Sequence, residues 1–336
     1  MKKIFLVLVL LSNLIFAKSE FMKICENPTV EQKFTLDRLF GTKEKYTFEL
    51  CQELTKEIID YKRIYLLKRD YKKELKISDL SPIKDFIYSE ELTIQNNNIT
   101  DISPLKNLKN LKKLDITYNP IDNIDVLSNL TNLEELSLDQ NNLKDLKPLK
   151  NLKNLKYLSI AGKNIHDKEE LDISSLSNLK NLKRLFLGVN PKDICALNSL
   201  TQLEKLTIIN RGITDISCLD TLTNLKSLEL YSNSIENIDV LKNYKELKTL
   251  QIETTPIKNI DALKDLENLH TVYVRRNPKL EDTSAISYKD LKNYEAYDNP
   301  KLNWCSPKTY NDMINHKSCF EKDGTLKPFW KRWLRI

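Results

Sequence analysis

The chain repeats the stretch LTIQNNNITDISPLKNLKN, residues 92–110, at a nearly constant interval. LDITYNPIDNIDVLSNLTN follows from Leu114 and LSLDQNNLKDLKPLKNLKN from Leu136. The same frame starts again at Leu158, Leu185, Leu206, Leu228, Leu250, Val272 and Tyr294. The differences in number between successive starts are 22, 22, 22, 27, 21, 22, 22, 22 and 22. A half-repeat, ISDLSPI, precedes them from Ile77. Ten frames at this spacing indicate a repeat protein.

The spacing of apolar residues predicts the structure of one repeat. Leu-x-Leu alternation is typical of a short strand with both leucines on one face. Leucines at every third position, such as Leu105, Leu108 and Leu111, indicate a helical or 3₁₀-like return. One repeat cannot close a core alone, so we expect repeats to stack, with their strands side by side in a parallel sheet.

An asparagine recurs five residues after the first leucine of most repeats. It is found as Asn97, Asn119, Asn141, Asn190, Asn233, Asn277 and Asn299. A buried amide at this point can satisfy backbone groups in the turn that leaves the strand, which predicts a structural role. Lys163, Arg211 and Thr255 replace it in three repeats.

These motifs resemble the leucine-rich repeat family. The repeated form LxxLxxLxLxxNxIxDIxxL is similar to that of bacterial internalins and of a phosphatase-regulating eukaryotic branch, and the resemblance covers about residues 77–300. It implies an α/β solenoid: a curved array of about ten repeats with a parallel sheet on the concave face. It says little about function, because this fold serves many partners.

The segments outside the repeats predict a leader and two caps. Residues 1–17, with Lys2 and Lys3 before an apolar run, are typical of a cleaved secretory signal peptide; an uncleaved membrane anchor is the alternative. Residues 18–76 are predicted to form a helical N-terminal cap, with a helix over residues 46–73. Residues 301–336 are predicted to form a short C-terminal cap, in which Ser306 and Pro307 suit a helix start.

The cysteines favour disulfides, because an exported chain meets an oxidising compartment. The 6 cysteines allow 15 pairings. The layout favours Cys25–Cys51 in the first cap and Cys305–Cys319 in the last. Aligning DICAL with DISCL offsets Cys195 from Cys218 by one residue, which with a strand spacing of ~4.8 Å and a rise of ~3.3 Å puts them ~5.8 Å apart. That separation allows a disulfide; an offset of two residues would not.

Several kinds of chemistry have no candidate residues in this sequence. The only histidines, His166, His270 and His316, are isolated, so neither a zinc site nor a base for a catalytic thiol is predicted. A chain with 5 glycines offers no glycine-rich phosphate loop. We expect no enzyme activity and no cofactor. The net charge of +6 in a chain that is 30% charged is mild, and does not argue for nucleic acid.

The strand positions that flank the inward leucines predict a binding surface. The first four repeats offer small and polar groups there, whereas later repeats offer bulky and charged ones. The predicted contact residues are Phe186, Ile209, Glu229, Tyr231, Glu253, Tyr273, Arg275 and Tyr297. Aromatic residues and arginine are typical of protein-binding hot spots. Single exposed aromatic residues are also ordinary, which is the alternative interpretation.

Two further segments have open interpretations. The longest step, from Leu158 to Leu185, contains an insertion, HDKEEL at residues 166–171. It is interpreted as a bulging surface loop or, less simply, a second contact. In the basic tail, Phe329, Trp330, Trp333 and Leu334 could share one helix face. Packing on the last repeat is the preferred interpretation, and contact with a membrane surface the alternative.

The leading hypothesis is an exported protein-binding module that acts through its concave face, as an adhesin, an effector-like factor or an envelope protein. A structural or inhibitory role in the periplasm is a second hypothesis. An intracellular scaffold similar to the phosphatase regulators is a third, should residues 1–17 not be a signal. The sequence does not identify the partner protein.

Overall fold

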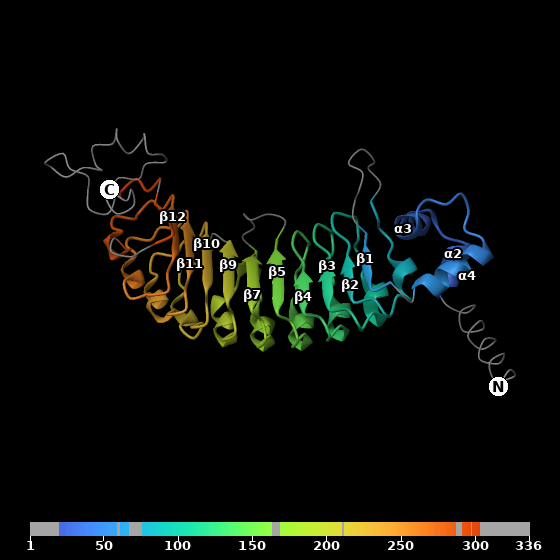
Figure 1. The fold of residues 1–336 in the computed structure, drawn as a ribbon, viewed down its shortest axis with the longest axis horizontal. Coiled ribbons are helices and arrows are strands. Elements are labelled where there is room, and N and C mark those ends of the chain that lie inside the picture. The colour runs from blue at the N-terminus through green and yellow to red at the C-terminus, as the bar shows by residue number, and fades with distance from the viewer. Residues whose placement is uncertain are drawn as a thin grey trace. The chain divides into compact units, whose positions relative to one another are not determined.

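The protein is described here by a computed structural model. It describes residues 20–58, 61–66, 76–162, 169–209, 212–286, 291–296 and 298–302. The chain forms two compact units, Met1–Asn164 and Ile165–Ile336. Within each unit the strands stand side by side, and the 3₁₀ helices form a second row below them in the view of Figure 1.

Three helices form the start of the first unit: α2 (Glu20–Glu26), α3 (Val30–Phe40) and α4 (Phe48–Glu57). The Thr29 side chain and the Gln32 side chain each accept a hydrogen bond from the other's backbone N–H, which is a capping box at the start of α3. The Cys25–Cys51 disulfide joins α2 to α4. The predicted helical character of this region and its disulfide are both present.

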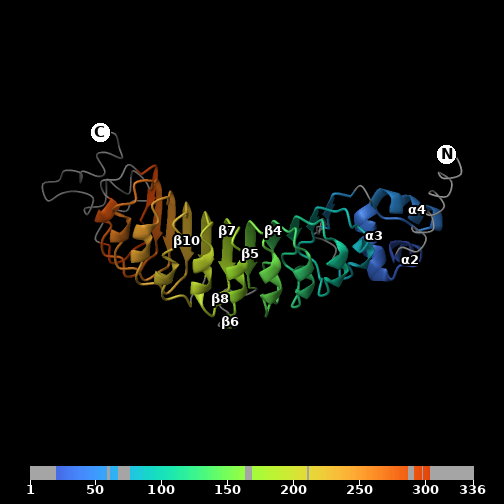
Figure 2. The same cartoon turned by 90° about the horizontal axis from the view of Figure 1, so that it is seen from below.

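Aromatic rings pack this helical region against the first repeat. Phe21 of α2 meets Phe86 edge-on at 6.1 Å between ring centroids. Phe40 of α3 meets Tyr61 at 5.8 Å in the same manner. Edge-to-face packing is favourable for aromatic pairs. Phe21 and Phe86 are fully buried, so they belong to the core that closes the first end of the repeats. Helices α2, α3 and α4 lie together at this end of the first unit (Figure 2).

The first unit contains parallel strands that pair in sequence order. They are β1 (Arg63–Tyr65), β2 (Glu91–Thr93), β3 (Lys113–Asp115), β4 (Glu135–Ser137) and β5 (Tyr157–Ala161). The predicted helix over residues 46–73 is confirmed for Phe48–Glu57 and wrong for Arg63–Tyr65, which form β1. Residues 59–60 and 67–73 lie outside the described residues. Ile64 is buried and pairs with Leu92, so β1 covers the edge of β2 that would otherwise be unpaired.

The second unit continues the same plan. Its parallel strands, again paired in sequence order, are β7 (Arg184–Gly188), β9 (Lys205–Ile209), β10 (Ser227–Tyr231), β11 (Thr249–Glu253), β12 (Thr271–Arg275) and β13 (Asn293–Glu295). Buried and half-buried residues alternate in β10, β11 and β12, as the Leu-x-Leu pattern predicts.

The return from each strand is a 3₁₀ helix. These helices are Ser81–Ile83, Ser103–Asn107, Asp125–Asn129, Lys147–Asn151, Ser174–Asn178, Ile194–Ser199, Ser217–Leu219, Asp239–Asn243, Asp261–Leu263 and Ser284–Ile286. In many of these helices, the side chain of an aspartate or asparagine accepts a hydrogen bond from the backbone N–H of the first helical residue, which lies two positions later. Asp101 accepts from Ser103 in this way. The prediction of a 3₁₀-like return is confirmed.

The recurring asparagine joins neighbouring repeats and is buried at every described position except Asn190, which is half-buried. Asn119 Oδ1 accepts from the backbone N–H of Ile99 at 3.1 Å, and its Nδ2 donates to the carbonyl of Ile94 at 2.7 Å. Asn141 makes the corresponding bonds to Ile121 and Ile116. The predicted structural role is confirmed. Each amide supplies both a donor and an acceptor to backbone groups that the strand ladder leaves unpaired.

The residue directly before the recurring asparagine, or before the residue that replaces it, turns the chain away from the strand. It has a left-handed backbone, with φ between 52° and 59°, at Asn96, Tyr118, Gln140, Ser232, Thr254, Arg276 and Asp298. Such a conformation costs about 1–2 kcal/mol for a non-glycine residue. The left-handed residue recurs at the same position of these repeats. The turn it makes places the asparagine side chain where it bonds to the preceding repeat.

The Cys195–Cys218 disulfide lies within the second unit. It links the 3₁₀ helices Ile194–Ser199 and Ser217–Leu219, with 5.5 Å between the Cα atoms. The offset of one residue is therefore the right alignment. The predicted Cys305–Cys319 bond, C-terminal helix and tail packing lie outside the described residues, as does the predicted signal peptide.

Part of the insertion forms a short strand. Glu170–Leu171 form β6, which pairs with β8 (Asn190–Pro191) in a separate two-stranded sheet. Leu171 is buried. The interpretation as a surface loop is therefore wrong for these two residues, because pairing with β8 satisfies their backbone and the core takes the leucine. Residues 166–168 are outside the described part.

Candidate functional site

The strand face of the second unit brings most of the predicted contact residues together. Strand register places Glu229 beside Gln251 and Tyr273 in one column. It places Tyr231 beside Glu253 and Arg275 in the next, with Ile209 on the other side of Tyr231. All of these side chains are half-buried. We call this surface, made by Phe186, Ile209, Glu229, Tyr231, Glu253, Tyr273 and Arg275, the open face.

Two carboxylates on the open face are held by basic partners. Glu229 contacts Lys205 Nζ at 2.5 Å and accepts from Thr207 Oγ1 at 3.1 Å. Glu253 contacts Arg276 at 2.7 Å. Each glutamate side chain is only 17% exposed. These pairs fix the orientation of the carboxylates more firmly than exposed pairs would.

The aromatic residues lie between these charges. The Arg275 guanidinium stacks over the Tyr273 ring at 4.8 Å, and its Nε lies 3.5 Å from Glu295. Burial, and then the charges of Glu229 and Glu253, raise the pKa of Tyr231 to about 12. Its phenol therefore stays protonated at neutral pH and can donate a hydrogen bond. The arrangement combines ring surface, a positioned cation and a phenolic donor.

Phe186 belongs to the open face but lies away from the aromatic and charged side chains around Tyr231 and Tyr273. Phe186 lies on β7 beside Thr207, in the same column as Glu229 but two strands away. Tyr297 lies outside the described residues. The use of the open face as a contact surface stays a prediction.

Sequence reasoning missed the more exposed aromatic residues of the first unit. Tyr65 is 49% exposed and Tyr118 58%. Tyr65 was hidden by the mistaken helix, and its hydroxyl donates to Glu91 at 3.2 Å. Tyr118 lies in the left-handed turn after β3, outside the two columns that the sequence singled out. Its position directly before the recurring asparagine was the signal that could have found it.

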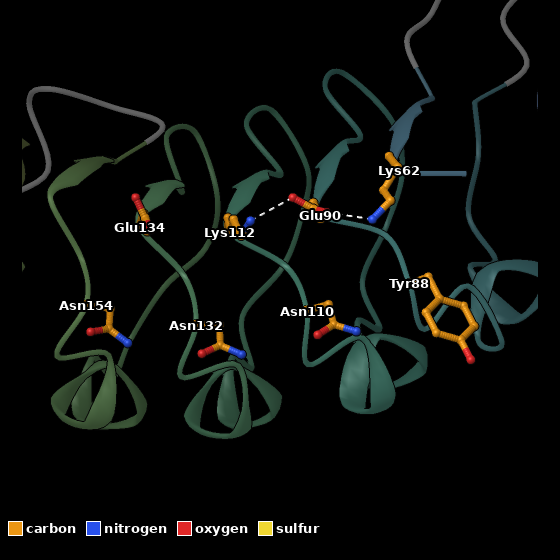
Figure 3. Close-up of a pocket in the computed structure, with 8 residues that line it drawn as sticks. All are labelled: Lys62, Tyr88, Glu90, Asn110, Lys112, Asn132, Glu134 and Asn154. Carbon is orange, nitrogen blue, oxygen red and sulfur yellow. Dashed lines mark hydrogen bonds and ion pairs between the residues drawn. The ribbon is translucent and has the colours of Figure 1, made fainter. Parts of the chain in front are cut away.

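A groove of about 420 Å³ lies in the first unit between the starts of the strands and the 3₁₀ helices. On one side stands a row of asparagines, Asn110, Asn132 and Asn154, one on each successive repeat (Figure 3). Each donates its Nδ2 to a carbonyl of the preceding repeat at 2.8–3.0 Å. These amides form a second ladder, on the 3₁₀ side of the repeat.

Charged side chains line the opposite side of this groove. Glu90 lies between Lys62 and Lys112 and is 2.8 Å from each (Figure 3). The hydrogen bonds and charges of Lys112 and Lys62 lower the pKa of Glu90 to about 2. Glu134 pairs with Lys156 at 2.6 Å. The groove is therefore lined by groups that neutralise one another.

Among the described residues, no group of three or more His, Cys, Asp or Glu side chains is placed to hold a metal ion. Within the same residues, no helix has the length and apolar character needed to cross a membrane.

A family model described as Leucine Rich repeats (2 copies) matches residues 90–129 and 131–172. With the strand, the 3₁₀ return and the asparagine ladder in place, that match assigns residues 90–129 and 131–172 to leucine-rich repeats. This chain carries leucine-rich repeats. The repeats form a scaffold of the kind found in internalins, as the resemblance implied.

Solved structures agree with this assignment. An internalin (inlF) from Listeria monocytogenes strain 4b F2365 is similar at 29% identity and a TM-score of 0.60, over 84% of this chain and 85% of that one. The TLR13–ssRNA13 complex is similar at 22% identity and a TM-score of 0.54, over 70% of this leucine-rich repeat chain and 37% of that chain. The second likeness concerns the fold alone. No curated protein matches the sequence.

Proposed function

We propose that this leucine-rich repeat protein is exported and binds another protein through the open face. The observation that carries the proposal is the grouping of Tyr231, Tyr273 and Arg275 between two oriented carboxylates. Tyrosine and arginine are enriched where interfaces concentrate their binding energy. Strands hold these side chains in place before binding, which lowers the entropy cost of association.

Export is supported by three observations. Residues 1–17 have the pattern of a signal peptide. The Cys25–Cys51 and Cys195–Cys218 disulfides suit an oxidising compartment. The chain is also similar to an internalin (inlF) from Listeria monocytogenes at 29% identity. We further propose the domain limits 18–76 for the first cap, 77–300 for the repeats and 301–336 for the last cap. Recovery of the chain from the cytoplasm with residues 1–17 retained would contradict export.

The test compares paired tyrosine variants of the two units. Tyr231→Ala with Tyr273→Ala removes two rings from the open face, and Tyr65→Ala with Tyr118→Ala removes two from the first unit. A partner is first captured by crosslinking to the wild-type chain and identified by mass spectrometry, and its Kd is then measured for each variant. We expect the open-face pair to weaken binding about 100-fold, the effect of two hot-spot residues.

The first-unit pair is the matched control, and its affinity is expected to stay within about twofold of wild type, since rim contacts contribute little. Unfolding curves of both variants establish that the fold survives. Loss of binding in the control but not in the open-face pair would place the contact surface in the first unit. Unchanged binding in both would remove the strand face as the contact surface.

A further inference from the structure

One column of side chains runs along the edge where each strand begins. It consists of the residue two positions before the first buried strand leucine or its equivalent. We call it the edge column, and its members are Lys62, Glu90, Lys112, Glu134 and Lys156 in the first unit, and Lys183, Glu204, Lys226, Lys248, His270 and Lys292 in the second. Each backbone N–H in the column donates to the carbonyl of the preceding member within its unit, at 2.7–2.9 Å.

These hydrogen bonds place neighbouring members one strand apart, about 4.8 Å. Charges at that distance act on each other strongly, because it is shorter than the screening length of about 8 Å at physiological salt. In the first unit the column alternates in sign, and ion pairs link Glu90 to Lys62 and Lys112. In the first unit, therefore, the positive and negative charges of the edge column neutralise one another.

The second unit begins in the same way and then stops alternating. Glu204 pairs with Lys183 and with Lys226. Lys226, Lys248, His270 and Lys292 then follow one another with no acid between them. Like charges on adjacent strands are unfavourable. The sequence keeps this cost between the adjacent Lys226 and Lys248, although an acid at position 248 would remove it.

No acid from elsewhere neutralises Lys248 or Lys292 within the described residues. Glu246, two residues before Lys248, is exposed and makes no ion pair there. On the strand face, Glu229 pairs with Lys205 and Glu295 with Arg275. His270 is half-buried, and its Nδ1 donates to the Asn268 carbonyl.

The neighbouring column begins the second unit with Arg184 and Lys205 and is uncharged over its last four positions. These four are Ser227, Thr249, Thr271 and Asn293, the residues that directly follow the four basic ones. The hydroxyls of Ser227 and Thr249 make no hydrogen bond within the described part of the chain. In the first unit the same positions hold charged pairs, Arg63 with Glu91 and Lys113 with Glu135. Asn293 Nδ2 donates to Thr271 Oγ1 at 3.5 Å. The second unit therefore offers a row of basic residues beside a row of uncharged hydroxyl and amide groups.

The residue types in these two rows indicate which class of anionic polymer could bind there. Lysine is depleted in protein interfaces, and these two columns contain none of the tyrosine, tryptophan or arginine that such interfaces use. Single-stranded nucleic acid is bound through aromatic residues on which bases stack, and only the His270 ring is present here. A polymer that carries both anions and hydroxyls matches both rows.

We propose that the edge formed by Lys226, Lys248, His270 and Lys292, with the adjoining Ser227, Thr249, Thr271 and Asn293, binds a linear anionic polysaccharide. The polymer would run across the strands, with anionic groups on the cations and hydroxyls on the neutral column. This site is separate from the open face and does not depend on the proposed protein partner.

The test uses the full chain with its disulfides intact and dextran sulfate as the probe. Neutral dextran and poly-glutamate are the comparison polymers. The variant Lys248→Glu with Lys292→Glu restores alternation along the edge column. The control, Lys106→Glu with Lys150→Glu, makes the same change of net charge on exposed 3₁₀ helices of the first unit.

We expect wild type to bind dextran sulfate but not dextran, and poly-glutamate about tenfold more weakly than dextran sulfate. The edge variant is expected to lose about tenfold in affinity and the control less than about twofold, because only neighbouring charges act at this salt. The thermal midpoint of the edge variant should not fall, since like charges are separated. An equal loss of affinity in the control variant would mean that binding depends on the net charge of the protein and not on the edge column. Binding of dextran, or equal binding of poly-glutamate, would overturn the assignment to an anionic polysaccharide.

Discussion

The two units build the same repeat but depart from it to different degrees. In the first, strands β2 to β5 start at a constant interval, and Asn97, Asn119 and Asn141 each bond to the preceding repeat through both amide atoms. In the second, the step from Leu185 to Leu206 is one residue short, and Thr255 replaces one asparagine.

The second unit also leaves polar groups unsatisfied. Asn233 Oδ1 is buried and has no hydrogen-bond partner among the described residues, although its Nδ2 donates to Ile208 and Tyr231. The same unit carries the repeat disulfide, the open face and the uninterrupted cations. The first unit thus shows what stacking alone requires, and each departure in the second has to be explained by something other than stacking.

The largest expected effect concerns the asparagine ladder. Asn119→Ala removes the partners of the Ile99 N–H and the Ile94 carbonyl in a buried position. Each unsatisfied buried group costs about 1–3 kcal/mol, so the free energy of unfolding should fall by about 4 kcal/mol. Asn233→Ala should cost only about 2 kcal/mol, because its Oδ1 has no partner to lose. Urea unfolding followed by circular dichroism measures both.

Equal costs at the two positions would contradict this difference between the units. It would mean that the ladder in the second unit is as complete as in the first.

The disulfide is the next test of the comparison. Cys195→Ser with Cys218→Ser opens a loop of 23 residues, which should cost about 3 kcal/mol of stability. The reason is that the bond limits the unfolded chain across the irregular step. Unfolding under oxidising and reducing conditions provides the measurement, and reducing agent should no longer affect the region around the variant. An unchanged midpoint would mean that the irregular step is stable without the bond.

The smallest effect is expected on the strand face of the first unit. Burial, and then the charge of Asp115, raise the pKa of Asp139, while the Ser159 hydroxyl donates to its carboxylate. The folded state thus holds this proton more tightly than the unfolded state, so the carboxyl contributes stability at low pH that is lost as pH rises. Asp139→Asn should therefore raise stability at pH 7 by about 0.5 kcal/mol, the scale of a surface substitution.

The gain from Asp139→Asn should disappear as the pH falls, since the wild-type carboxyl is then protonated. Urea midpoints at several pH values test this, and a gain that persists at low pH would assign the effect to packing instead.

The repeat fold was predictable because its signals are local and recur. Leu92, Leu114 and Leu136 define the strands, and alignment of Cys195 with Cys218 anticipated a separation of ~5.8 Å where the structure has 5.5 Å. The strand Arg63–Tyr65 was not predictable in this way, because its distance along the chain from its partner β2 does not match the repeat interval. Its pairing depends on the exposed edge of β2, which the sequence of β1 does not contain.

The candidate site was predictable only in part for a related reason. Alternation identifies which side chains leave the core, and so grouped Tyr231 with Tyr273. It does not show how far each is exposed, and therefore missed Tyr118. The ion pairs that hold Glu229 and Glu253 also depend on register between repeats, which places Lys205 beside Glu229.

The central claim is that the open face of the second unit contacts a protein partner. Hydroxyl-radical footprinting of the full chain, with and without the partner captured by crosslinking, tests it at the level of single side chains. We predict that oxidation of Tyr231 and Tyr273 falls in the complex, while that of Tyr65 and Tyr118 does not change. Protection of Tyr65 and Tyr118 with unchanged oxidation of Tyr231 and Tyr273 would contradict the claim.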